Sequence, residues 1–251
     1  MTPQTIDDVL DSLDQLIRKA REEKSRLGYF AALYRNVTLN VKEGIASGLF
    51  DDGERMERLD VTFANRYLSA FDCFRRGEPC SKCWLGCFRL SASWSPIILQ
   101  HLLTGINAHI NFDLGIAAQA VAPGAELASL KNDFETINGI LGGMIVKARS
   151  NIEEVSPWIK LLDRVNPRGE DALVKFSLDK ARTSAWLVAN LVNETPSARL
   201  SRELSILDDG VSILGNLIGS PREWLLRFGL YVIRVRESND VPHIIDVLSQ
   251  V

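Results

Sequence analysis

The sequence predicts an all-α protein, and three observations support this fold class. Apolar residues recur at helical spacing through nearly the whole chain, as Ile6, Val9 and Leu13 do near the N-terminus. No stretch shows β-type alternation of useful length, and no Pro/Ser/Gly-rich linker divides the 251 residues. We therefore expect one all-helical domain over residues 1–251, a multi-helix bundle around a buried central helix. The N-terminal helices of residues 5–50 are expected to pack as a peripheral subunit of that bundle.

Caps and helix breakers set the expected boundaries. Thr5 is a suitable N-cap for the first helix, and the segment SGLFDDG at 47–53 has the composition of a turn. Pro123 with the following glycine ends the central apolar stretch, and residues 156–169 hold a short helix that begins at a Ser-Pro pair. The longer helices are expected over residues 5–24, 28–46, 54–75, 95–122, 125–150, 171–194, 198–218 and 221–237.

The stretch from Ser95 to Ala122 is the predicted centre of the fold. Pro96 suits the first turn of a helix, where its missing N–H costs nothing. The stretch is apolar on nearly every side, and a helix of that kind is buried. It nevertheless carries polar side chains, among them Gln100, His101, Asn107, His109, Asn111 and Asp113.

Buried polar groups need partners, because an unpaired one costs about 1–3 kcal/mol. His101, His109 and Asp113 fall within an arc of about 120° on a helix, and Asn107 and Asn111 share another side. Three interpretations stay open: a structural network with His109 and Asp113 paired one turn apart, a divalent-metal site with the two histidines and the aspartate as ligands, and a metal-free polar pocket. The eight-residue spacing of the histidines matches neither His-Glu-x-x-His nor Glu-x-x-His, so spacing alone favours the network over the metal.

Two polar residues outside the central stretch are candidates for the same pocket. Asp133 lies among apolar residues, although a solvated helix position is its simpler interpretation. Arg182 shares one helix face with Asp179, Trp186 and Asn190, where an Asp–Arg ion pair is the favoured interpretation.

All four cysteines, Cys73, Cys80, Cys83 and Cys87, lie within fifteen residues. Four thiolates can bind zinc or an iron–sulfur cluster. The second, separated C-x-x-C of a zinc ribbon is missing, so free thiols or an adventitious disulfide are favoured in an intracellular chain.

Charge and hydropathy restrict the partners. A net charge of -3 gives no electrostatic reason to expect a nucleic acid or an anionic membrane. The acidic, amphipathic N-terminus is not a signal peptide, and the polar residues of the central stretch make its insertion into a bilayer expensive. We expect a soluble, cytoplasmic protein, and the sequence does not predict its oligomeric state.

The segment QHLLTGINAHINFDLGIA at residues 100–117 resembles the hallmark QHLLLGMNAHINLDLGIA of an uncharacterised, mainly bacterial family classed as a domain of unknown function. The resemblance extends to FANRYLSA at 63–70, DFETIN at 133–138 and the Arg182-x-x-x-Trp186 helix, and so runs from about Asp60 to Gly219. It implies a site built around the polar residues of the central stretch, without a known activity. The cysteine cluster is not part of that pattern.

The functional hypothesis is a buried polar pocket of His, Asn and Asp side chains on the central helix. His109 is the candidate general base and Asp113 the residue that orients it; with His101 they are also the candidate metal ligands. Asn107, Asn111, Asp133 and Arg182 are candidate binding residues. A metal-assisted hydrolase and a small-molecule-binding protein both fit this site. The alternative is a non-enzymatic interaction or scaffold module with a purely structural network, and the sequence leaves open whether the protein is an enzyme.

Overall fold

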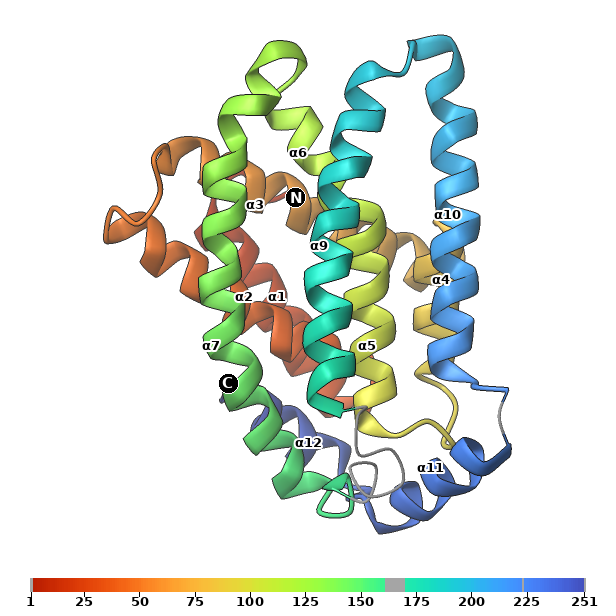
Figure 1. Cartoon of the computed structure of the whole chain (residues 1–251). Helices are drawn as coiled ribbons and strands as arrows, with labels where there is room; N and C mark the ends of the chain where they lie inside the picture. Colours follow the sequence, from red (N-terminus) through yellow and green to blue (C-terminus); the bar gives the residue numbers. More distant parts are fainter. Residues whose placement is uncertain (1, 161–169, 223, 251) are drawn as a thin grey trace.

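A computed structural model describes residues 2–160, 170–222 and 224–250, and these residues form helices with no strand among them (Figure 1). The predicted all-α fold is confirmed. The helices are α1 (Ile6–Glu22), α2 (Gly28–Ala46), α3 (Gly53–Arg76), α4 (Lys82–Leu90), α5 (Ile98–Ala108), a π-helix (His109–Leu114), α6 (Gly115–Val121), a 3-10 helix (Gly124–Leu130), α7 (Lys131–Val155), α9 (Glu170–Glu194), α10 (Ser197–Gly219), α11 (Trp224–Arg236) and α12 (Val241–Leu248).

Local signals in the sequence explain several helix ends. The Thr5 hydroxyl accepts a hydrogen bond from the backbone N–H of Asp8 (3.1 Å), and the Asp8 carboxylate accepts one from the N–H of Thr5 (3.0 Å), which makes a capping box for α1. Helix α3 ends at Gly77, whose φ of 72° lies in the left-handed region that glycine adopts without strain.

The central stretch is not the single regular α-helix that the sequence predicts. Helix α5 begins at Ile98 rather than at Pro96, and the side-chain oxygen of Gln100 accepts a hydrogen bond from the N–H of Ile97 (3.0 Å). From His109 to Leu114 the backbone then widens into a π-helix before α6 resumes the α-helical form. Insertions of this kind recur at functional sites.

Two further boundaries differ from the prediction. The helix expected from residue 125 starts as a 3-10 helix, and α7 begins only at Lys131. Cys83 and Cys87 lie in α4 rather than in a loop before the central helix. Most of the short helix expected at residues 156–169 lies outside the described residues.

The central helices are enclosed by neighbours from both halves of the chain. Helices α2, α4 and α10 pack on α5, whereas α3 and α9 pack on the π-helix and α6. Figure 1 shows α5 in the middle of this bundle. Gly115 permits the close approach of α9, because a Cβ there would clash with the carbonyl oxygen of Ala185. Phe30 and Tyr34 of α2 reach the centre, so helices from residues 5–50 contribute directly to the core.

Helix α11 lies across one end of the bundle (Figure 1). Leu230 and Ile233 on its inner side cluster with Ile97 in a small apolar core. Among the helices of the described ranges, none is both long and apolar enough to span a bilayer.

Candidate functional site

Asp113, on the π-helix, joins three elements of the bundle through one buried carboxylate. Arg66 of α3 donates from Nε to Oδ1 (2.8 Å), and Trp84 of α4 donates from Nε1 to Oδ2 (2.7 Å). The Nδ1 atom of His109 lies 3.4 Å from Oδ2 of Asp113. The predicted pairing of His109 with Asp113 is therefore present, within a larger network than the sequence indicated.

The environment of His109 keeps its imidazole neutral. Burial lowers the pKa of His109, and hydrogen bonding to Asp113 together with its negative charge only partly opposes that effect. With Nδ1–H directed at the carboxylate, the tautomer assigned by this network leaves Nε2 as a hydrogen-bond acceptor. Nε2 of His109 is buried and has no hydrogen-bond partner.

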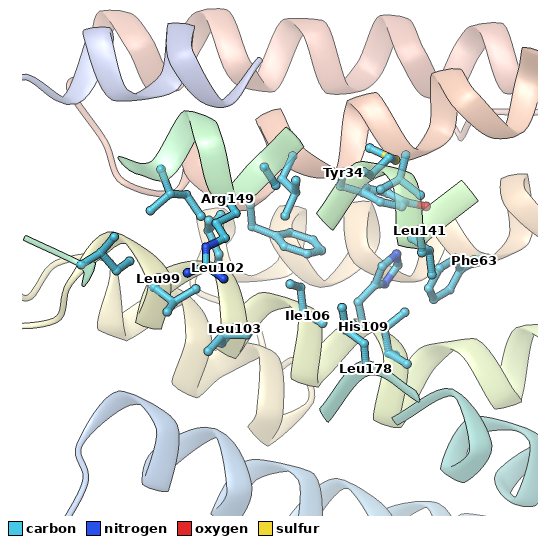
Figure 2. A pocket seen from close by; sticks show the side chains of 18 residues that line it. Tyr34, Phe63, Leu99, Leu102, Leu103, Ile106, His109, Leu141, Arg149 and Leu178 are labelled. Atoms are coloured by element: carbon cyan, nitrogen blue, oxygen red, sulfur yellow. The ribbon is translucent and has the colours of Figure 1, made fainter. Parts of the chain in front are cut away.

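Aromatic rings hold the His109 imidazole on several sides. The Phe63 ring stacks on it with 3.5 Å between centroids and 7° between planes. The Tyr34 ring meets it edge-on at 4.5 Å, and the Phe30 ring does so at 5.7 Å. Figure 2 shows the His109 side chain rising from its helix toward Tyr34, with Phe63 beside it. This packing fixes the ring plane and leaves little freedom to rotate.

His109 also lines an apolar cavity of about 160 Å³. Among the described residues of its wall, the one other charged side chain is that of Arg149, whose Nε donates to Glu153 (3.4 Å). Figure 2 shows His109 and Arg149 toward opposite ends of the cavity. The remaining lining residues are apolar or aromatic: Phe30, Leu33, Tyr34, Val37, Phe63, Leu99, Leu102, Leu103, Ile106, Ile110, Leu141, Met144, Ala148, Ile152, Ile159 and Leu178.

Asp113 and Arg66 line a different opening, a polar cleft of about 420 Å³. Its walls also include Asn65 and Ser69 of α3. The His109–Asp113 pair therefore has an apolar cavity on the histidine side and a polar cleft on the aspartate side.

The structure does not assemble the metal-ligand set His101, His109 and Asp113. In the part of the chain that the structure describes, no three His, Cys, Asp or Glu side chains form a group that could hold a metal ion. Eight residues of helix separate the two histidines by about 12 Å along the axis. The His101 ring packs edge-on against Tyr29 (5.8 Å between centroids), and burial lowers its pKa to about 3, with the positive charges of Arg26 and Arg234 adding to the effect.

Asn107 bonds to α10, Asn111 bonds to Asn107, and neither residue is among those that line the cavity. Nδ2 of Asn107 donates to the backbone oxygen of Val211 (2.9 Å), and Nδ2 of Asn111 donates to Oδ1 of Asn107 (2.9 Å). Nε2 of Gln100 likewise donates a hydrogen bond to a backbone oxygen of α10, that of Ile218 (2.7 Å). These amides tie the central helices to α10, as a structural network does.

Asp133 is buried, so its interpretation as a solvated helix position is wrong. Its carboxylate accepts hydrogen bonds from the backbone N–H groups of Asp51 (2.6 Å) and Asp52 (3.2 Å) and from Nη2 of Arg55 (3.0 Å). These partners anchor α7 to the turn before α3. They satisfy both carboxylate oxygens, and Asp133 is not among the residues that line the cavity.

Arg182 is buried against α7. Its guanidinium donates to the backbone oxygen of Phe134 and lies 4.6 Å from the centroid of the Phe134 ring. Burial lowers its pKa to about 10, an effect that the charge of Asp179 only partly opposes. Arg182 thus joins α9 to α7 and, like Asp133, does not line the cavity.

The four cysteines are free thiols. Cys83 is buried, and burial raises the pKa of its thiol. Cys73 and Cys80 line the polar cleft. Free thiols are one of the two interpretations that the sequence favoured, the other being an adventitious disulfide.

Sequence reasoning missed the residues that complete the site. Tyr34 and Phe63 surround His109, and Trp84 and Arg66 bind Asp113. Aromatic residues at helical spacing look the same whether they line a cavity or fill a core. The one sequence feature that could have indicated some of these residues is the FANRYLSA segment, which contains Phe63 and in which Arg66 stands among apolar residues.

Comparison with known proteins gives one match. The family model described as "Family of unknown function (DUF5995)" matches residues 6–221, a range that contains every residue of the His109–Asp113 network and the cavity. No curated protein and no solved structure matches the chain.

Proposed function

This chain belongs to the DUF5995 family, whose function is unknown, and we propose from the geometry of its own site that it binds a small apolar molecule carrying one hydrogen-bond donor. The ligand occupies the cavity beside His109, and its donor group bonds to Nε2 of His109. The observation that carries this proposal is the buried, unpartnered Nε2 of a cavity-lining, neutral histidine.

The size and walls of the cavity define the ligand class. A cavity of about 150 Å³ lined by aliphatic and aromatic side chains can hold one benzene ring, and this cavity is about 160 Å³. Phe30, Tyr34 and Phe63 offer ring faces and edges at the end that His109 occupies. A single six-membered ring or a short branched chain therefore fits best, and phenol combines that size with one O–H donor.

His109 supplies the selectivity for such a ligand. An unsatisfied buried acceptor costs about 1–3 kcal/mol, so a ligand that donates to Nε2 recovers part of that free energy. Asp113 positions the imidazole, and Arg66 and Trp84 in turn position Asp113. The site needs no metal ion for this role, and the donors of the candidate metal set do not converge on one point.

Calorimetric titration with phenol tests the proposal. We expect wild type to bind with a dissociation constant of about 1 mM or lower, equivalent to about −4 kcal/mol. Ala148→Phe places a ring in the cavity and should weaken binding at least tenfold, since Ala148 lines its wall. Ala198→Phe makes the same substitution on the exposed surface of α10 and serves as the matched control.

The competing function is an interaction module whose polar network only fixes the register of the helices. It predicts no saturable binding of phenol to wild type, or equal binding to wild type and Ala148→Phe. Either result would favour the module over the ligand-binding protein.

A further inference from the structure

Helix α11 exposes an apolar stripe on the side opposite its buried face. Trp224, Phe228 and Tyr231 are 72%, 63% and 56% exposed. Together with Val235 they follow one another at i, i+4, i+7 and i+11, so they share one side of the helix. Burial of Leu230 and Ile233 against Ile97 fixes which side faces solvent.

Two further exposed tryptophans extend this stripe. The Trp94 ring lies 6.4 Å from the Tyr231 ring, and the Arg236 guanidinium lies 4.9 Å from the Trp158 ring centroid. Trp94 and Trp158 are both exposed, so three of the five tryptophans of the chain are exposed at the α11 end of the molecule.

The charges of α11 all have one sign. The helix contains three arginines and no acidic residue, and Arg227 and Arg236 are exposed, as is Arg222 just before it. Glu237, which follows the helix, is buried, and desolvation raises its pKa to about 7. In the sequence, the acidic residue Glu223 stands between Arg222 and Trp224, the first residue of the helix.

We infer that the α11 face, defined as Trp224, Phe228, Tyr231 and Val235 with Arg222, Arg227 and Arg236, docks on an anionic lipid surface. Tryptophan and tyrosine rings favour the headgroup region of a bilayer, and arginines close to an anionic membrane are attracted to it. A helix with an aromatic side and only basic charges lies in the plane of such a surface. The net charge of -3 is a sum over the whole chain, so it does not indicate the local excess of positive charge on α11.

The chemistry of this face distinguishes it from the other exposed apolar surface. Leu187 of α9 and Ile213 of α10 are also well exposed, but the exposed large apolar residues described on those helices are all Leu or Ile, and the charges on those helices are mixed. A second copy docked on the α11 face would bring like-charged arginines together, which is unfavourable. The α11 face lies beyond residue 221, where the family match ends, and the inference does not depend on the cavity ligand.

Vesicle flotation with the full chain tests this inference. The probes are vesicles of phosphatidylcholine alone and vesicles of phosphatidylcholine mixed with phosphatidylglycerol. We expect wild type to float with the anionic vesicles at low salt, to be released as salt rises, and to bind neutral vesicles at least tenfold more weakly. Trp224→Ser/Phe228→Ser should lower binding to anionic vesicles at least tenfold, and Arg227→Gln about fivefold.

Leu187→Ser/Ile213→Ser is the matched control, because it removes two apolar side chains of similar exposed fraction, 65% and 62%, from other helices. Circular dichroism checks that each variant is folded. Failure of wild type to bind anionic vesicles, or an equal loss of binding in the control, would overturn the inference. A third result would also overturn the inference: size-exclusion chromatography shows that wild type is a dimer, Trp224→Ser/Phe228→Ser is a monomer, and neither protein binds vesicles. In that case the α11 face joins two copies of the chain.

Discussion

The Nδ1 atom of His109 lies 3.4 Å from Oδ2 of Asp113, and this pair stands between an apolar cavity and a polar cleft. The same aspartate accepts hydrogen bonds from Arg66 and Trp84, so it holds the bundle together while it orients the histidine. A structural network and a binding site therefore share residues in this protein. Experiments must separate loss of stability from loss of ligand binding.

Replacement of Asp113 should lower stability strongly. Asp113→Ala removes the carboxylate that accepts from Arg66 and Trp84, and so leaves the Arg66 guanidinium and the Trp84 N–H without this partner. We expect the free energy of unfolding to fall by about 3 kcal/mol. Asp113→Asn keeps an acceptor for the Trp84 indole and should cost less. Urea denaturation measures both changes. The control is Asp209→Ala, which breaks the exposed ion pair with Lys82 and should leave the free energy of unfolding nearly unchanged. If Asp113→Ala and Asp209→Ala lowered the free energy of unfolding equally, this account of Asp113 would be wrong.

His101 should make the protein less stable in mild acid. Its pKa is about 3 in the folded chain and 6.5 in the unfolded chain, so between these values the unfolded chain binds more protons. The contribution to stability is fully present above pH 6.5 and declines as the pH falls toward 3. At pH 5 the loss amounts to about 2 kcal/mol.

Urea denaturation of wild type and His101→Gln at pH 7.5 and pH 5.0 measures this contribution. The decrease in unfolding free energy between the two pH values should be about 2 kcal/mol smaller in the variant. His243→Gln replaces an exposed histidine and provides the control. Identical pH dependence of wild type and His101→Gln would show that His101 is not the responsible group.

The cysteines should react with alkylating reagents at different rates. Burial raises the pKa of Cys83 and also blocks access to its sulfur, whereas Cys73 and Cys80 line the open cleft. In native protein at pH 8, iodoacetamide should modify Cys83 far more slowly than Cys73, as measured by peptide mass spectrometry. In urea the rates should converge; equal rates in the native protein would contradict the buried position of Cys83.

The sequence was sufficient for features that depend on neighbouring residues. The Thr5 cap and the His109–Asp113 pair each involve residues within four positions, and both are present. Features that depend on distant residues were not predicted. The Arg55 partner of Asp133 lies 78 positions away, and Trp84 approaches Asp113 from a separate helix.

The cavity is the clearest example of this limit. Its wall combines residues from α2, α3, α5, α7 and α9, and whether apolar side chains leave a space between them depends on how the helices pack. Apolar periodicity identifies residues that face inward. It does not separate a filled core from a core with a cavity.

The most direct measurement of the central claim is the affinity of phenol relative to toluene in wild type and in His109→Phe. The variant retains an aromatic ring to stack on Phe63 but has no acceptor at the Nε2 position. We expect phenol to lose five- to tenfold in affinity relative to toluene in the variant, equivalent to about 1–1.4 kcal/mol for one hydrogen bond. Toluene binding should persist in His109→Phe, which shows that the cavity remains. An unchanged phenol-to-toluene ratio in a folded variant would contradict the role assigned to His109.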